Sequence, residues 1–145
     1  MASASCAAPL PERPTLCQLV EMRQGYAGHV VTVEGYLLVS FHGSVVLDPR
    51  CSRGVAIGWR SGDQPRLRAL TAIVPQVRDI AEPWMVRVRV TGVWEMTWDR
   101  DYGEGWRLNL AAADVLSAQR LPDEDWERYS HWLDGPSPGP FRPSR

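Results

Sequence analysis

The residues best suited to bind a ligand lie on two alternating segments and on the turn between them. Arg87 and Arg89 alternate on the first segment, Arg107 lies on the second, and the turn carries Arg100 and Tyr102. Guanidinium groups bind phosphate and carboxylate groups, and an exposed aromatic ring stacks on bases or other flat ligands. These five residues are the candidate ligand-binding set.

The arginines of the two segments also have a simpler interpretation. On exposed strand faces they can pair with surface acids such as Glu95 and Asp99, and such pairs contribute little to stability. The chain has 16 basic and 17 acidic residues, a net charge of −1, so it is not a strongly basic nucleic-acid-binding protein. We therefore favour a solvated, paired face, although a local basic patch is compatible with this balance.

The turn itself is acidic and rich in glycine. Asp99, Asp101 and Glu104 could offer oxygen ligands to calcium, but the further spaced ligands of a calcium loop are missing and Arg100 lies among the acids. We expect a polar turn without a metal, and we keep a metal-dependent hydrolase at residues 99–105 only as a second alternative.

No combination of residues predicts catalysis. His42 lies near Ser40 and Ser44, and Asp48 could orient it, but no serine elbow is present. Phosphate-binding glycine loops, dinucleotide fingerprints and Cys/His zinc spacings are also missing from the sequence. We expect no catalytic residue, no cofactor and no enzyme.

Seven tryptophans raise the question of stacking surfaces. Trp94, Trp98 and Trp106 share their alternation with apolar neighbours in both segments. Aromatic rings at such positions usually pack in the core. We expect most of these rings to be buried, and Tyr102 to be the better candidate for an exposed one.

The elements that would position these residues follow from periodicity. Thr15 and Gln18 form a capping box that begins a short helix. Alternating apolar residues predict strands, and helical spacing in the connection 60–83 is limited by Pro75. The predicted strands are 29–41, 44–48, 55–59, 85–98 and a return from 106 that breaks near 111–113 and resumes over 115–121; a last helix covers 123–133.

Two repeated patterns carry a resemblance. Residues 26–35, YAGHVVTVEG, and 86–92, VRVRVTG, each contain V-x-V-x-G with a glycine at the bend of a strand. They resemble small bacterial OB-fold proteins of uncharacterised, exported type. The resemblance implies a mainly β fold, a five-stranded OB-like barrel with a short N-terminal helix, a partly helical connection between the third and fourth strands and a short C-terminal helix. We expect a flexible leader (1–13), a barrel domain (14–121), the C-terminal helix (122–134) and a disordered Pro/Gly tail (135–145).

The cysteines bear on the compartment. The placement of Cys17 in the first helix and Cys51 in a turn looks similar to that in the same proteins, and in such a fold the helix can reach the turn. A Cys17–Cys51 disulfide would leave Cys6 free and indicate export, periplasmic or lipid-anchored after a signal is trimmed. Three reduced thiols in a cytoplasmic protein remain the alternative.

The function that this fold implies is binding. We expect a non-enzymatic interaction module whose ligand is a protein or a small molecule, bound between the turn at 42–50 and the hairpin tip at 99–106. The alternative is a single-stranded nucleic-acid-binding protein that uses Arg87, Arg89, Arg107 and Tyr102. No apolar run is long enough to predict a membrane span.

Overall fold

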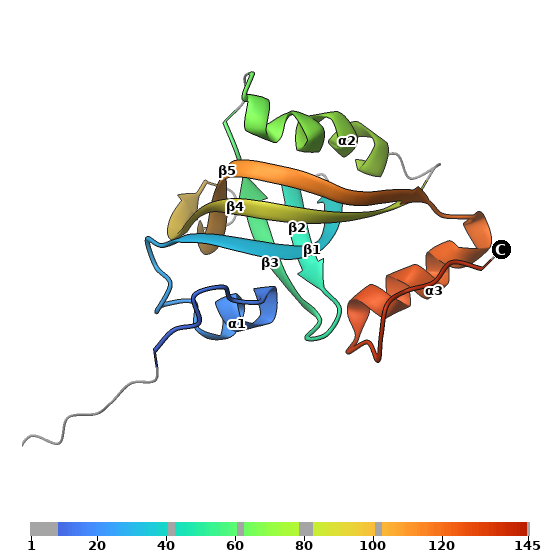
Figure 1. Cartoon of the computed structure of the whole chain (residues 1–145), viewed down its shortest axis with the longest axis horizontal. Helices are drawn as coiled ribbons and strands as arrows, with labels where there is room; N and C mark the ends of the chain where they lie inside the picture. Colours follow the sequence, from blue (N-terminus) through green and yellow to red (C-terminus); the bar gives the residue numbers. More distant parts are fainter. Residues whose placement is uncertain (1–8, 41–42, 61–62, 79–82, 101–102, 145) are drawn as a thin grey trace, which may run out of the picture.

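The fold is mainly β, as predicted, and consists of one five-stranded sheet with three α-helices (Figure 1). A computed structural model describes residues 9–40, 43–60, 63–78, 83–100 and 103–144. The strands are β1 (Val30–Ser40), β2 (Gly43–Asp48), β3 (Arg53–Gly58), β4 (Trp84–Asp99) and β5 (Gly103–Arg120). The helices are α1 (Leu16–Glu21), α2 (Arg68–Arg78), preceded by the 3₁₀ turn η1 (Pro65–Leu67), and α3 (Asp123–Asp134).

The sheet closes on itself through a ring of hydrogen bonds. The strand order is β1-β2-β3-β5-β4, and β4 pairs back with β1. Every pair is antiparallel except β3 with β5, which run parallel and are paired only over Ala56–Gly58 and Arg107–Asn109. The seam between β3 and β5 is therefore the shortest ladder of the ring.

β5 corrects one sequence expectation. The predicted break near 111–113 is not a break, because β5 continues from Gly103 to Arg120. Thr91 pairs with Ala112 and Gly92 pairs with Leu110, so Ala111 is an extra residue in β5. Such a bulge interrupts the alternation of side chains while the strand goes on, which is why the pattern looked broken.

Helices cover the sheet from both sides, α1 below and α2 above it in Figure 1. The predicted capping box of α1 is confirmed: the Gln18 amide donates to Thr15 Oγ1 at 3.1 Å, and the Thr15 amide donates to Gln18 Oε1 at 2.9 Å. Leu16 and Leu19 of α1 and Leu70 of α2 are fully buried and belong to one hydrophobic core together with strand residues. No helix in the described ranges combines the length and the apolar character needed to cross a membrane.

The C-terminal segment differs from the expected disordered tail. Residues 135–144 fold back along α3, where the Phe141 ring lies 5.2 Å from the ring of Tyr129. The Trp132 indole donates to the Gly139 carbonyl at 2.9 Å, and the Ser137 amide donates to the Pro49 carbonyl at 3.0 Å. The prolines and glycines of this segment suggested disorder, but Phe141 within it packs against the aromatic rings of Tyr129 and Trp132 on α3.

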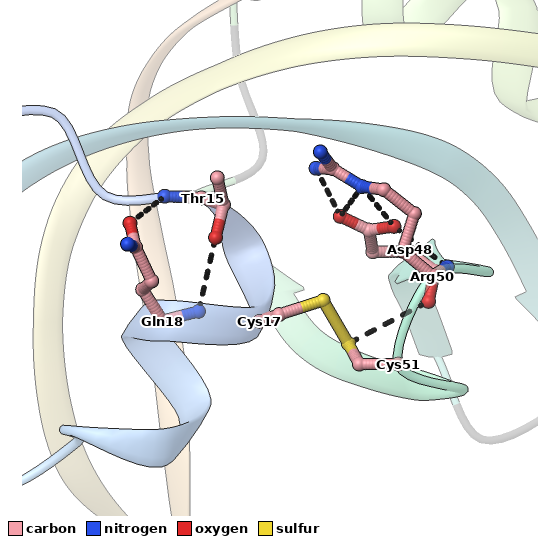
Figure 2. The surroundings of a disulfide bond; sticks show 6 residues. All are labelled: Thr15, Cys17, Gln18, Asp48, Arg50 and Cys51. Carbon is pink, nitrogen blue, oxygen red and sulfur yellow. Dashed lines mark hydrogen bonds and ion pairs between the residues drawn. A yellow bond between two sulfur atoms is a disulfide. The ribbon is translucent and has the colours of Figure 1, made fainter. Parts of the chain in front are cut away.

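A disulfide joins Cys17 to Cys51, so the expected pairing is confirmed (Figure 2). It links α1 to the turn between β2 and β3, with 6.0 Å between the two Cα atoms. The buried Asp48 shapes that turn, since its carboxylate accepts from the Arg50 amide at 3.0 Å and from the Arg50 guanidinium at 2.6 Å. The turn is thus held by a covalent bond and by a charge-assisted hydrogen bond.

The disulfide predicts a simple thiol count. Alkylation of the unreduced, denatured protein, followed by intact mass, is expected to detect one free thiol, which peptide mapping assigns to Cys6. After reduction the count rises to three. Three free thiols before reduction, in protein prepared under oxidising conditions, would contradict the pairing.

Candidate functional site

A cleft opens where β3 and β5 diverge at the end of their short seam. Its volume is about 440 Å³, within the usual range of small ligand sites. β3 contributes Gly54, Val55 and Ala56 to one wall, and β5 contributes Glu104, Gly105 and Trp106 to the other. We call this the seam cleft.

Two stacked tryptophans, Trp94 and Trp106, line the seam cleft. The rings of Trp94 and Trp106 lie 5.4 Å apart with planes 13° from parallel. The Trp94 indole donates to the Arg23 carbonyl at 2.9 Å, which ties β4 to the residues after α1. Val20 and Arg23 complete the lining from that side. The stacked rings thus form an aromatic part of the cleft wall, and Trp94 within it is hydrogen-bonded.

An apolar ridge extends from the seam cleft along the hairpin of β4 and β5. Trp94 is 2% exposed, but Met96 is 48% and Trp98 70% exposed along the same face of β4. Met96 pairs across the hairpin with the half-buried Trp106. We call Met96, Trp98 and Trp106 the hairpin ridge.

The exposure of Trp98 differs from the burial expected of it. Alternation correctly assigns Trp98 to the inner face, but β4 and β5 have 16 and 18 residues while β3 has only six. The hairpin extends past the strand that would cover its inner face, so the ring faces solvent. No pattern within the hairpin itself reports the length of a distant strand.

Arg87 and Arg89 share one acidic partner that the sequence did not indicate. Arg87 donates to Glu34 Oε2 at 2.6 Å and Arg89 donates to Glu34 Oε1 at 2.8 Å. The expected partners were Glu95 and Asp99, but the pairing of β1 with β4 brings Glu34 directly opposite Arg89. Two of the four expected basic residues are thus ion-paired on the sheet surface, and Glu34 offsets one of their two positive charges.

The triad of Glu34 predicts a small pH effect. The hydrogen bond from Arg89 and the positive charges of both arginines hold the pKa of Glu34 below its ordinary value of 4.5. A lowered folded-state pKa stabilises the protein above pH 4.5, and this contribution is lost as pH falls through the folded pKa. Because Glu34 is 35% exposed, Glu34→Gln should cost about 1 kcal/mol or less at pH 7.

Urea unfolding at pH 7 and at pH 3 measures this effect. The cost of Glu34→Gln should shrink at the lower pH, while Glu21→Gln, an exposed acid without an ion pair in the described part of the chain, should cost little at either pH. A cost of Glu34→Gln that stays constant with pH would contradict the assignment.

The remaining predicted site residues lie apart from Arg87 and Arg89. Arg107 lies opposite Glu95 in the β4–β5 ladder, and Glu95 is six residues along β4 from Arg89. Arg107 also lines a separate hollow of about 490 Å³ beside Gly58. Arg100 is exposed in the turn after β4. Tyr102 lies outside the described residues. The five candidates therefore do not form one continuous stripe.

The expected mouth also divides into two places. Gly43, where β2 begins, and the turn at Asp48–Cys51 lie at opposite ends of β2. Only the second is on the side of the seam cleft, because β3 begins there and runs parallel to β5. His42 itself lies outside the described residues.

The acidic hairpin tip is only partly described. Glu104 is exposed and lines the seam cleft, Asp101 lies outside the described residues, and so does the side chain of Asp99. Among the side chains that are described, no three His, Cys, Asp or Glu residues gather closely enough to hold a metal ion.

A larger hollow of about 820 Å³ lies between the residues before α1 and the outer face of β1. It is mainly polar, and two of its arginines already have acidic partners: Arg50 binds Asp48 and Arg89 binds Glu34. A ligand there would have to compete with these ion pairs. The seam cleft imposes no such competition and is the better candidate site.

No protein-family model matches this chain, and no curated protein is significantly similar to it. The function must therefore be argued from the seam cleft and the hairpin ridge themselves.

Proposed function

We propose that this protein is a non-enzymatic binding module built on an OB-type barrel, and that its ligand occupies the seam cleft. The ring order β1-β2-β3-β5-β4, the parallel β3–β5 seam and the helix between β3 and β4 support the OB assignment. In such barrels ligands bind between loops and exposed strand faces, so the site is consistent with the fold.

The observation that carries the proposal is the hairpin ridge. An exposed tryptophan beside an exposed methionine, continuous with a cleft, is costly to leave in water. Tryptophan is among the residues that contribute most at binding sites, and methionine adapts its shape to a partner. The ridge is therefore best explained by a ligand, a protein or a small molecule, that covers it.

The disulfide supports a proposed location outside the reducing cytoplasm. Cys17 and Cys51 hold α1 on the turn before β3, and structural disulfides persist in oxidising compartments. We infer that the protein is exported and is either periplasmic or lipid-anchored.

Replacing Trp98 by alanine tests the proposal. The probes are short peptides and aromatic small molecules, screened by amide and indole NMR shifts of the labelled full chain. Ligands that bind should shift the NMR signals of Gly54, Gly105 and the Trp98 indole. Trp98→Ala should lower their affinity about 30-fold, because a central tryptophan contributes ~2 kcal/mol to the binding free energy. The matched control is Trp126→Ala, which removes another exposed tryptophan, 43% exposed on α3.

Two other outcomes would change the assignment. Hits that shift only signals around the polar hollow beside β1, or that respond equally to both tryptophan variants, would contradict the proposed site. Binding of a thymidine oligonucleotide that disappears as salt rises would favour the single-stranded nucleic-acid alternative. We rank that alternative second because Arg87 and Arg89 are both engaged by Glu34, which offsets one of their two positive charges.

A further inference from the structure

The seam cleft contains two strand edges that the ring of hydrogen bonds leaves open. The parallel ladder begins at Ala56 and Arg107, and counting back two places on each strand gives Gly54 and Gly105. Each of these keeps a partner only on its other side, Leu47 of β2 for Gly54 and Thr97 of β4 for Gly105. Both glycines line the seam cleft instead of pairing with each other.

Open edges of this kind favour an added strand. Backbone N–H and C=O groups that no neighbour satisfies are a template for pairing with another chain. Both positions are exposed glycines. An added Cβ on Gly105 would meet no atom within 4 Å, whereas one on Gly54 would meet the Leu47 and Val45 side chains of β2 at 2.5 and 2.6 Å. Neither glycine carries a side chain of its own, so Gly105 is open to a second backbone, and Gly54 is covered by β2 side chains on one face.

The surroundings offer sites for alternate side chains. In a bound strand every second side chain points to the same face, here toward the stacked rings of Trp94 and Trp106, with Met96 and Trp98 further out along the ridge. Apolar residues at alternate positions would cover this surface.

The described lining of the seam cleft carries two charged side chains, Arg23 beside α1 and Glu104 on β5. The only contact that Arg23 makes through its guanidinium among the described residues is with the Val20 carbonyl at 3.5 Å. It has no acidic partner there, so it can receive a carboxylate from a ligand. A partner would match this wall of the cleft if its acidic group lies on the Arg23 side, away from the like charge of Glu104.

We propose that the seam cleft binds an extended segment of another polypeptide, which pairs as an added strand with the open edges at Gly54 and Gly105. The segment carries apolar side chains at alternate positions for the hairpin ridge and a carboxylate for Arg23. This inference rests on the proposed function and specifies its ligand as a protein in extended conformation.

The test uses linear peptides selected on the full chain. A phage-displayed library of random peptides is panned against the wild-type protein, with an excess of the soluble Trp98→Ala protein as competitor. Selected peptides are then synthesised with a single N-methyl group at successive residues, which removes one N–H donor at a time. Because a strand that lies between two edges offers its donors alternately to β3 and to β5, methylation should weaken binding about three- to ten-fold at each residue that lies between the two edges, and should have little effect at residues beyond them.

Two measurements on the protein complete the test. Bound peptide should slow amide hydrogen exchange in residues 53–55 and 104–106, but not in the β1–β2 pair. Arg23→Gln should lower the affinity for acidic peptides and leave the affinity for their amidated versions unchanged. If peptide binding depends on Trp98 but is not weakened by N-methylation, the peptide does not pair as an added strand, and the proposed function is unaffected. If no selected peptide depends on Trp98 while small molecules do, the polypeptide ligand is wrong; if no ligand of any class depends on Trp98, both proposals fail.

Discussion

Replacing Gly92 by alanine is expected to lower the free energy of unfolding by about 3 kcal/mol, the upper range for overpacking a core. A Cβ at this position would lie 2.1 Å from the carbonyl oxygen of Asn109, 2.6 Å from its carbonyl carbon and 2.9 Å from the Leu110 Cα. All three atoms belong to the backbone of β5, so no side-chain rotation can relieve the overlap. The strands must separate at the point where β4 bends.

Gly105→Ala is the matched control on the same hairpin. Its added methyl group would meet nothing within 4 Å, so the free energy of unfolding should change by less than about 1 kcal/mol. Urea unfolding followed by far-UV circular dichroism measures both variants. Equal losses at the two positions would show that close approach of β4 to β5 is not what requires glycine at Gly92.

Replacing Cys17 and Cys51 together by serine is expected to cost about 3–4 kcal/mol, the entropic effect of a cross-link that closes a loop of this length. The cross-linked residues are 34 apart in the sequence. In a chain of this size, the loss corresponds to a fall in Tm of roughly 10 °C. The fold should persist, because Leu16 and Leu19 still anchor α1 in the core.

Reductant and the third cysteine supply the controls. Wild-type protein measured with reductant should unfold at the midpoint of the double serine variant, and reductant should not shift that variant further. Cys6→Ser should leave the midpoint unchanged in either condition. A double variant as stable as the oxidised wild type would mean that the unfolded chain gains no entropy when the link is removed.

Local features of the fold could be predicted from the sequence because short-range contacts determine them. The capping box of Thr15 and Gln18 depends on residues three apart and is confirmed. The inward row of β4, with Val86, Val88 and Val90 fully buried, follows from alternation alone. These patterns need no knowledge of which strand lies beside which.

The features that the sequence did not predict depend on register between distant strands. Glu34 became the partner of Arg87 and Arg89 only through the pairing of β1 with β4. Trp98 is exposed because β3 is too short to cover the hairpin, and Ala111 is extra only relative to Gly92 on the neighbouring strand. The candidate site lies where β3 and β5 are not paired, before their short ladder begins. The alternation of residues within one strand does not indicate where pairing with another strand begins.

The link between α1 and the turn before β3 also determines how mechanical tension would pass through the molecule. The segment between Cys17 and Cys51 contains most of α1 and all of β1 and β2, so the covalent link carries a force applied at the N-terminus past these elements. Such a force reaches the sheet at Cys51, two residues before β3. If the protein is tethered by its N-terminus, tension is delivered first to β3, the strand that forms one wall of the seam cleft.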